Sequence, residues 1–514
     1  MSHVADPIIV GQQTLTIAQV AAVAAGASVQ LNDQPAYVAS IERGAQFIDS
    51  LLAEEGVVYG VTTGYGDSCT VAVNQALVAE LPLHLTRFHG CGMGQHLSSA
   101  QARAVMVCRL NSLAQGKSGV SYALLQRLTE LLNRNIVPLI PEEGSVGASG
   151  DLTPLSYLAA VLQGERQVLF NNEIQETAAV YQQLHITPLV LRPKEGLALM
   201  NGTAVMTALA CLAYQRADYL ARLCARITAL ASITLQGNSH HFDEILFNAK
   251  PHPGQMQVAK WIRDDLQHHQ HPRNANRLQD RYSIRCAPHI IGVLVDAQPF
   301  MRQFIETELN SANDNPIVDA AGEHILHGGH FYGGHIAFVM DSLKNAVANL
   351  ADLLDRQMAL LMDPKFNNGL PANLSGSQGP RQVINHGFKA VQIGCSAWTA
   401  EALKLTMPAS VFSRSTECHN QDKVSMGTIA ARDALRVLTL TEQVASAALL
   451  AVSQGIRLRL RQAELSEQEL SPSLSTLLNQ LTAELPLVEE DRPLEQTLRD
   501  TLAKIQQAVW EVPQ

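Results

Sequence analysis

The residues with the clearest chemical potential lie between positions 144 and 156, which read Gly-Ser-Val-Gly-Ala-Ser-Gly-Asp-Leu-Thr-Pro-Leu-Ser. Ala148-Ser149-Gly150 are three small residues in a row, so the backbone there can fold tightly onto itself. Pro154 suits the first turn of a helix, and Asp151 or Thr153 can cap that helix. A helix that starts beside the loop would add positive potential to it. Taken alone, the segment also fits a common glycine-rich helix cap.

Two distant residues could act together with this loop. Tyr59 precedes a segment with glycines at positions 60, 64 and 66, whose pliability permits closure over a bound molecule. Because a free phenol has a pKa of about 10, Tyr59 could take up a proton at neutral pH only in a positive field, such as that of nearby helix N-termini. Arg285 carries a planar guanidinium that matches both oxygens of a carboxylate. The glycine spacing matches neither GxGxxG nor a Walker motif, so phosphate binding is not expected.

The composition argues against several classes of partner. The 514 residues include 37 basic and 47 acidic side chains, a net charge of −10, and no dense run of lysine and arginine. Binding to nucleic acid or to an anionic membrane is therefore not expected. Hydrophobic residues make up 46% of the chain and charged residues only 16%. So little charged surface favours a large buried interface, and hence an oligomer.

Cysteine usage and the first residues indicate a cytoplasmic protein. The eight cysteines are scattered without a Cys-x-x-Cys pair, which is typical of a reduced intracellular chain. Residues 1–20 lack a basic start followed by an apolar run, so no signal peptide is expected. The apolar window Val437–Ile456 is interrupted by Thr, Glu, Gln and Ser, which argues against a membrane span. His268-His269-Gln270-His271 is interpreted as a solvated polar loop, and no metal site is expected.

The elements that must position these residues change character along the chain. Near the start, Pro7–Val10 is a strand candidate and Thr16–Ala25 a helix, and Gln167–Glu176 reads as a hairpin because Asn171-Asn172 tolerates left-handed turn positions. From about Gly196 onward, long segments repeat apolar residues at helical spacing. These segments are Ala198–Leu235, Tyr332–Met362 and Thr428–Gln454. Helices of about 30 residues span about 45 Å, which favours a bundle shared between subunits over an ordinary large helical domain.

A series of motifs in a fixed order points to one family. Besides the loop at 144–156, the series comprises Tyr59-Gly60-Val61-Thr62-Thr63-Gly64-Tyr65-Gly66, Asn201-Gly202-Thr203, Gln279-Asp280-Arg281-Tyr282-Ser283-Ile284-Arg285, Asn313-Asp314-Asn315-Pro316, Gly328-Gly329-His330-Phe331 and Asn420-Gln421-Asp422-Lys423-Val424-Ser425-Met426. Together they run from residue 59 to residue 426. In this order they resemble the signature of the aromatic amino acid lyases, the histidine, phenylalanine and tyrosine ammonia-lyases and related aminomutases that carry a methylidene-imidazolone (MIO) group.

The resemblance implies that the chain makes its own cofactor and needs no external one. The amide nitrogen of Gly150 would attack the carbonyl of Ala148 and close a ring with loss of one water, and Ser149 would lose a second water to leave an exocyclic methylene. That methylene would capture the amine of an amino acid and turn it into a better leaving group. Tyr59 would be the base that removes the β-proton, and the Asn313–Pro316 motif would shape a turn near the site.

The remaining site residues are also assigned by the resemblance. Arg285 would anchor the substrate carboxylate, and Phe331 would wall the site. The residues expected to hydrogen-bond the carboxylate or the MIO carbonyl oxygen are Asn201, Gln279 and Tyr282. The resemblance further implies a mainly α fold, with an MIO-bearing mixed domain at residues 1–200 and a fumarase/aspartase-like long-helix bundle at residues 201–514. Family members assemble as homotetramers whose sites draw residues from several subunits.

Substrate choice is expected to depend on Phe88, His89 and Gln421. At the first two positions tyrosine lyases typically carry His-Leu, phenylalanine lyases Phe-Leu and histidine lyases Ser-His, and this chain matches none of them. Histidine lyases typically carry a glutamate where this chain has Gln421. Since His89 could hydrogen-bond a phenolic hydroxyl, tyrosine ranks first, phenylalanine second and histidine third. Two further departures from the family pattern are Tyr65, where Phe is common, and His330, where Asn is common.

Three hypotheses follow. The first is an ammonia-lyase that converts L-tyrosine, or L-phenylalanine, to the trans-arylacrylate, with histidine ammonia-lyase as an alternative. The second is a 2,3-aminomutase that returns the amine to the β-carbon. The third is a non-catalytic protein that keeps the fold for binding or assembly, which the presence of Tyr59, Ser149 and Arg285 disfavours.

Overall fold

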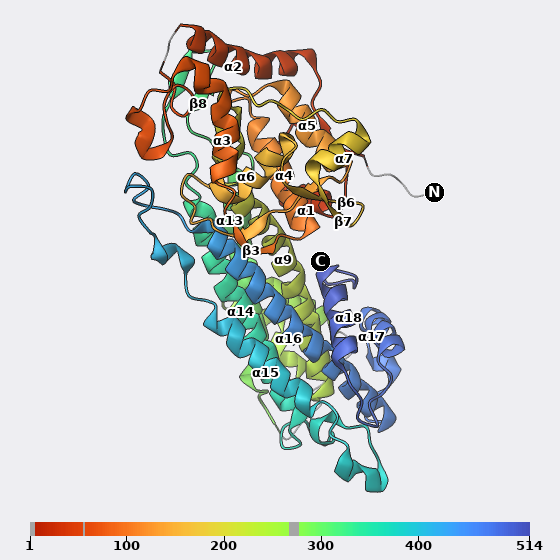
Figure 1. Ribbon diagram of the computed structural model, residues 1–514. Coiled ribbons are helices and arrows are strands. Elements are labelled where there is room, and N and C mark those ends of the chain that lie inside the picture. Colours follow the sequence, from red (N-terminus) through yellow and green to blue (C-terminus); the bar gives the residue numbers. More distant parts are fainter. Residues whose placement is uncertain (1–5, 55–56, 267–276) are drawn as a thin grey trace. The chain divides into compact units, whose positions relative to one another are not determined.

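The computed structural model describes residues 6–54, 57–266 and 277–514. Long helices dominate these residues, which confirms the expected mainly α fold with a long-helix bundle (Figure 1). The polar segment at 268–271 lies outside the described residues. The α-helices are α1 Ile17–Ala24, α2 Pro35–Ala53, α3 Leu81–Phe88, α4 Ser99–Leu113, α5 Tyr122–Asn133, α6 Leu152–Leu162, α7 Thr177–Leu184, α8 Glu195–Met200, α9 Ala204–Thr234, α10 Glu244–Asn248, α11 Pro253–Asp265, α12 Tyr282–Arg285, α13 Ala287–Leu309, α14 Gly334–Met362, α15 Lys389–Lys404, α16 Gly427–Arg461, α17 Pro472–Glu484 and α18 Glu495–Gln506.

Short strands accompany these helices. They are β1 Ile8–Val10, β2 Val29–Leu31, β3 Met93–His96, β4 Val137–Pro138, β5 Pro141–Glu143, β6 Gln167–Phe170, β7 Glu173–Glu176, β8 Ile317–Asp319 and β9 His324–Leu326. The strand and the helix predicted near the start of the chain are confirmed as β1 and α1. The predicted hairpin is confirmed as the antiparallel pair β6–β7, and Asn171 and Asn172 occupy left-handed positions with φ of 53° and 63°.

The chain divides into two compact units, and each unit is made of three separate segments. The first contains residues 1–215, 302–341 and 408–432, and the second contains residues 216–301, 342–407 and 433–514. The boundary expected at residue 200 is a single cut in the sequence. The observed units interleave because α9, α13, α14 and α16 each contribute residues to both of them.

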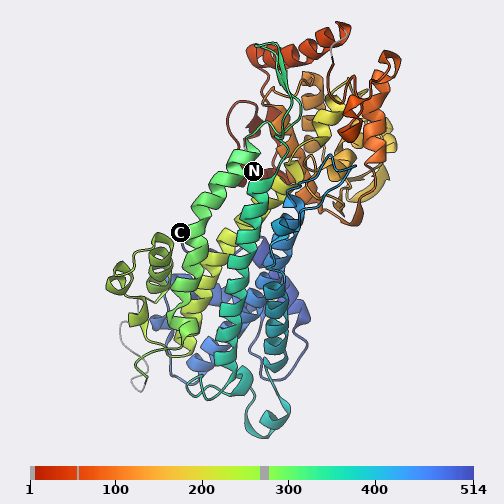
Figure 2. The ribbon, with the colours of Figure 1, turned by 90° about the vertical axis from the view of Figure 1, so that its left-hand side faces the viewer.

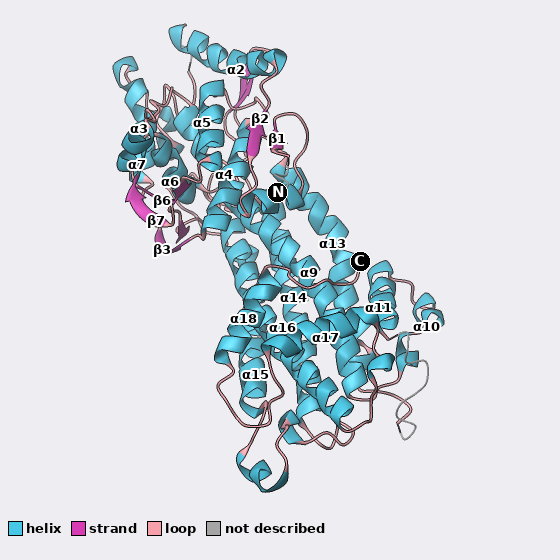
Figure 3. Ribbon diagram, turned by 90° about the vertical axis from the view of Figure 1, so that its right-hand side faces the viewer, coloured by secondary structure: helices cyan, strands magenta, loops and turns pink. Residues whose placement is uncertain are grey.

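The first unit is built around α4, which is buried on all sides from Ala102 to Leu113. Its start is defined by a capping box in which Ser98 and Gln101 exchange side-chain and backbone hydrogen bonds. Helices α1, α5 and α8 pack against α4. Every strand among the described residues belongs to this unit (Figure 3). This helix-centred core is the support for the loops described below.

The second unit is a helical bundle to which α15 and parts of α9, α14 and α16 contribute (Figure 2). Hydrogen bonds tie these helices together, from Thr441 in α16 to Val347 in α14 and from Gln357 in α14 to Thr228 in α9. By length and composition α16 could cross a membrane, but 83% of its most apolar window is buried inside the protein. This burial is that of a core helix.

Candidate active site

The loop at Ala148-Ser149-Gly150 contains consecutive residues in left-handed conformations. Ser149 has φ of 53° and Gly150 has φ of 76°, and Gly147 just before them has φ of 75°. A left-handed conformation costs a non-glycine residue such as Ser149 about 1–2 kcal/mol, so the surroundings must hold it in place. The tight backbone expected from three small residues is therefore present.

Gly202 forms the wall behind this loop. Gly150 pairs with Gly202 in an isolated parallel bridge, and the amide of Asp151 donates to the Gly202 carbonyl at 2.8 Å. A Cβ on Gly150 would overlap the Gly202 carbonyl and would lie 2.8 Å from the Gly202 amide nitrogen. Only glycine fits at position 150, because the backbone there is left-handed and because Gly202 leaves no space for a side chain.

The fully buried carboxylate of Asp151 ties the loop to two helix starts. It accepts hydrogen bonds from the amides of Val205 and Met206, both at 3.0 Å, in the first turn of α9. It also accepts from the hydroxyl of Thr428 in α16 and from that of Ser145. Asp151 precedes α6 as predicted, but it does not cap that helix, because its oxygens serve α9 and α16 instead. Burial raises the pKa of Asp151, and these hydrogen bonds oppose the shift.

A second buried network lies behind Gly202. Arg109 in α4 is fully buried and donates to the carbonyls of Asn313 at 3.0 Å, Asn201 at 3.2 Å and Ala198. Lys194 and Asp314, both fully buried, form an ion pair at 2.6 Å. Burial lowers the pKa of Lys194, and the Asp314 carboxylate opposes that shift. The network fixes the backbone on which Gly202 sits.

Tyr59 is held with its hydroxyl oxygen facing the start of a short 3₁₀ helix, η1, at Gly66–Thr70. The Gly66 amide donates to Tyr59 Oη at 2.8 Å. Burial raises the pKa of Tyr59, the Gly66 hydrogen bond lowers it, and the charge of Glu417 raises it further. A helix start does face the phenol, as expected. Its effect on the pKa of Tyr59 is smaller than that of burial, so the net shift is upward.

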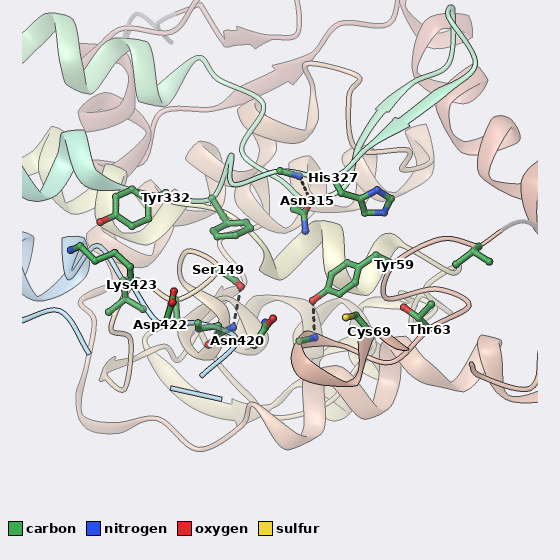
Figure 4. A pocket seen from close by; sticks show the side chains of 18 residues that line it. Tyr59, Thr63, Cys69, Ser149, Asn315, His327, Tyr332, Asn420, Asp422 and Lys423 are labelled. Carbon is green, nitrogen blue, oxygen red and sulfur yellow. Dashed lines mark hydrogen bonds between the residues drawn. The ribbon is translucent and has the colours of Figure 1, made fainter. Parts of the chain in front are cut away.

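One cavity of about 570 Å³ brings Tyr59 and the loop at 147–149 together (Figure 4). All of its lining residues belong to the first unit. They are Val57, Tyr59, Thr63, Gly66, Cys69, Gly147, Ala148, Ser149, Asn315, His327, Gly328, Phe331, Tyr332, Asn420, Gln421, Asp422, Lys423 and Val424. Of the residues singled out from the sequence, Tyr59, Ala148, Ser149, Phe331 and Gln421 meet here.

Gln421 connects directly to the loop. Its amide nitrogen donates to Ser149 Oγ at 3.1 Å, and its amide oxygen accepts from the hydroxyl of Thr416 at 3.0 Å. Gly147 is confined from the same side, because a Cβ there would lie 3.1 Å from the Met426 amide nitrogen. Small residues, left-handed backbone and a donor on the Ser149 hydroxyl fit the cyclisation that the resemblance implies.

Asn201, Phe88 and His89 belong to the first unit but do not line the cavity. Asn201 is buried, and its amide donates to the Asn315 carbonyl at 3.3 Å. The Phe88 ring lies 4.2 Å from the His89 ring and 6.5 Å from that of Tyr65. Phe88 thus connects His89 to Tyr65, which belongs to the same motif as Tyr59, at residues 59–66.

His89 has a defined hydrogen-bonding state. Its Nδ1 lies 3.0 Å from the Leu85 carbonyl, which can only accept, so Nδ1 must carry the proton. Burial and the nearby charge of Arg166 lower the pKa of His89, whereas the Leu85 hydrogen bond raises it. The neutral ring therefore keeps Nε2 as an acceptor.

Gln279, Tyr282 and Arg285 belong to the second unit, whereas all residues that line the cavity belong to the first. Tyr282 is 71% exposed, and the Arg285 guanidinium lies 4.7 Å from the centre of its ring. Arg285 Nε donates to the Asp280 carbonyl at 2.9 Å. The resemblance alone groups these three residues with Tyr59.

The structure adds residues that the sequence did not single out. His327 lines the cavity, and its ring lies 6.4 Å from that of Tyr59 in an edge-to-face arrangement. It directly precedes the Gly328–Phe331 motif, and this position next to a family motif is the sequence feature that could have identified it. Asn315, expected only to shape a turn, also lines the cavity and accepts from the Gly328 amide at 2.8 Å. Within the described ranges, no three His, Cys, Asp or Glu side chains form a group that could hold a metal ion.

Comparison with known proteins assigns a family to this geometry. A sequence model of the aromatic amino acid lyases matches residues 15–483. A histidine ammonia-lyase from Bos taurus is 39% identical over 424 residues, which cover 81% of this chain but only 64% of the bovine protein. A histidine ammonia-lyase from Bacillus velezensis is 36% identical over 454 residues, 88% of this chain and 86% of its own. The structure of a tyrosine aminomutase from Streptomyces globisporus superposes with a TM-score of 0.91 at 33% identity, over 98% of this chain and 97% of that one.

Proposed function

The chain belongs to the aromatic amino acid lyase family, and we propose that it is a carbon–nitrogen lyase that releases ammonia from an aromatic L-amino acid. The electrophile would be an MIO group made from Ala148, Ser149 and Gly150. When formed, this group supplies an electrophilic carbon that activates the substrate amine for departure.

One observation carries the proposal. Tyr59 and Ser149, which are 90 positions apart in the sequence, face the same cavity. An elimination needs a base for the β-proton and an activated amine on the neighbouring carbon, so both groups must reach one small molecule. A volume of about 570 Å³ is in the range of small-molecule sites. The proton would pass to Tyr59 Oη, which the Gly66 amide holds in position.

The ring of the substrate is proposed to carry a hydrogen-bond donor, as in L-tyrosine. His89 does not line the cavity, so this contact would require the substrate ring to reach past Tyr65 toward it. There the neutral His89 offers Nε2 as an acceptor, which suits a phenolic hydroxyl. Gln421 cannot supply the carboxylate that would pair with an imidazole, and its amide oxygen is engaged by the Thr416 hydroxyl. L-phenylalanine, which lacks a ring donor, ranks second.

Two other functions are supported by specific observations. L-histidine also has a ring N–H that His89 could accept, and the relatives from Bos taurus and Bacillus velezensis are histidine ammonia-lyases. The similar structure from Streptomyces globisporus is a tyrosine aminomutase, so a 2,3-aminomutase is the third candidate. All three candidates would use the same cavity and base.

The site is proposed to be completed in a homotetramer. The carboxylate anchor assigned to Arg285 would then come from another subunit, together with Gln279 and Tyr282. Large exposed apolar side chains on three helices support a subunit interface. They are Val293 on α13 at 61% exposed, Phe338 on α14 at 56% and Ile393 on α15 at 65%.

Complementation tests this assembly. Tyr59→Phe and Arg285→Ala homo-oligomers should each be inactive, whereas co-expressed chains should regain activity, because some sites then combine an intact Tyr59 with an intact Arg285. Light scattering on the same samples gives the mass of the assembly. A monomer, or mixtures as inactive as the parents, would contradict the shared site.

Two measurements test the reaction. The intact mass of the purified chain should be two waters below that of its sequence, and that of Ser149→Ala should show no such loss. A panel of L-tyrosine, L-phenylalanine and L-histidine, followed by product absorbance and released ammonia, then identifies the substrate. A β-amino acid product would identify the aminomutase instead. An unmodified, inactive chain would contradict the proposal and favour a non-catalytic protein.

A cytoplasmic location is also proposed. It is supported by the eight cysteines, all of which carry free thiols. Fractionation of the source cells with an antibody against the chain would test it.

A further inference from the structure

Glu417 contacts the segment that carries the base. Both of its carboxylate oxygens accept from the amide of Asp67, at 3.1 and 3.0 Å. Asp67 follows Gly66, the residue whose amide donates to Tyr59 Oη. The carboxylate thus binds the start of η1, where backbone amides are free to donate.

The fit between Glu417 and Gly66 is close. A Cβ on Gly66 would lie 2.5 Å from Cδ of Glu417, in the space that the carboxylate occupies. Gly66 also has φ of 59°, which favours glycine. Position 66 therefore needs glycine for two reasons, and one of them is the approach of Glu417.

The turn that presents Glu417 is strained and closed by hydrogen bonds. Glu417, Cys418 and His419 all have left-handed backbone, with φ of 50°, 52° and 65°. Thr416 and Gln421 pair across the base of the turn, and the Asn420 amide donates to the Glu417 carbonyl at 2.9 Å. Three consecutive left-handed residues cost several kcal/mol, so the surroundings must enforce this conformation.

The same turn reaches the electrophile loop. At its base, Gln421 donates to Ser149 Oγ at 3.1 Å. From its tip, Glu417 holds the start of η1 and so the amide that meets Tyr59. One closed turn thus contacts both the residue proposed to dehydrate and the segment that places the base.

We propose that Glu417 is a positioning residue of the reaction, which sets the place of the Tyr59 hydroxyl through η1 and acts on its proton through charge. This inference rests on the proposed function for the role of Tyr59. Glu417 does not line the cavity, and its contact with η1 is the route by which it would act on Tyr59.

The charge of Glu417 acts on Tyr59 in a known direction. A negative charge near a phenol disfavours the phenolate, and the pKa of Tyr59 is raised by Glu417 as well as by burial. Removing the charge should therefore lower that pKa. Among the described residues, the other titratable groups that line the cavity, interact with Tyr59 or lie on η1 are Cys69, His327, Tyr65, Asp67, Tyr332, Asp422 and Lys423, and the variants change none of them.

Two variants separate charge from position. Glu417→Gln keeps an oxygen that can accept from Asp67 but removes the charge, and Glu417→Ala removes both. Glu173→Gln is the matched control, because it makes the same charge change at an exposed site on β7 outside the cavity. Intact mass shows whether each variant still makes its electrophile.

The first readout does not depend on turnover. A rapid pH-jump titration of tyrosinate absorbance, with the corresponding Tyr59→Phe protein subtracted, isolates Tyr59. Glu417→Gln should shift this titration to lower pH by about half a unit to one unit, as expected for a like charge in a partly exposed site. Glu173→Gln should leave it unchanged. A Glu417→Gln curve that coincides with the unmodified protein, or an equal shift in Glu173→Gln, would overturn the inference.

The second readout uses the reaction. Because the phenolate is the active base, the acidic limb of kcat/KM should move to lower pH in Glu417→Gln. In Glu417→Ala, kcat should fall roughly tenfold or more while KM stays within about twofold, because the base is misplaced and the cavity lining is intact. Retention of full kcat in Glu417→Ala would overturn the positioning role. If no amino acid is turned over, the proposed function fails, and the titration alone decides the role of Glu417.

Discussion

Gly202→Ala tests how tightly the electrophile loop is supported. A Cβ at position 202 would overlap Nη1 of Arg109 and lie 2.7 Å from the Asn313 carbonyl oxygen. Neither neighbour can move freely, because Arg109 is fully buried and its guanidinium is bonded to three backbone carbonyls. Gly202 does not have a left-handed φ, so the substitution adds a steric conflict without backbone strain.

The expected cost follows from these contacts. Overpacking a rigid core costs about 1–3 kcal/mol, and loss of one hydrogen bond to a buried charged group costs about 1.5–3 kcal/mol more. Together they predict a loss of about 2.5–6 kcal/mol in the free energy of unfolding. Displacement of Gly202 would also move Gly150 and Asp151, which are bonded to it. A smaller fraction of chains should therefore complete dehydration.

Urea unfolding and intact mass measure the two effects. Gly394→Ala in α15 is the matched control, because its nearest neighbour would be Trp398 at an ordinary 3.4 Å. That variant should be neutral or more stable by about 0.5–1 kcal/mol, since alanine favours a helix interior. If Gly202→Ala unfolds at the same urea concentration as the unmodified protein and is fully dehydrated, the reasoning about this wall is refuted.

Three further outcomes are expected. Asp151→Asn should lower the free energy of unfolding by about 2–3 kcal/mol in urea, because an amide cannot accept from all four donors around it, and unchanged stability would contradict this role. Lys194→Met should cost about 3–5 kcal/mol by the same measurement, because it strands a buried charge on Asp314, and adding Asp314→Leu should restore much of the loss. If the double variant is no more stable than Lys194→Met alone, the coupling between Lys194 and Asp314 is contradicted. His89→Leu should lower kcat/KM for L-tyrosine at least about tenfold more than for L-phenylalanine, as followed by arylacrylate absorbance, and equal losses would remove His89 from substrate selection.

Local features were predictable because their causes lie in neighbouring residues. The long helices follow from apolar residues at helical spacing, and the β6–β7 hairpin follows from two asparagines that tolerate left-handed backbone. The tight loop at 148–150 follows from its small side chains. The resemblance to one family added the order of the motifs, and the family match confirms that recognition.

Partners of polar groups could not be read from the sequence. Asp151 precedes a helix and fits the pattern of a cap, yet its carboxylate binds the starts of α9 and α16. The phenol of Tyr59 meets a helix start, as expected, but burial has the larger effect on its pKa. Both outcomes depend on what packs nearby in space, which short-range sequence patterns do not record.

By itself the sequence determined the long-helix architecture, the glycine-rich loop and the family of the chain. Each depends on residue type and spacing along a few turns of backbone or on an ordered set of motifs. Only the tertiary structure decided that Tyr59 and Ser149 share a cavity, that Glu417 holds the segment of the base, and that His89 presents an acceptor. These contacts join segments that are far apart in the chain, or they depend on burial. Close packing and the need to satisfy buried polar groups select them, and neither can be read from neighbouring residues.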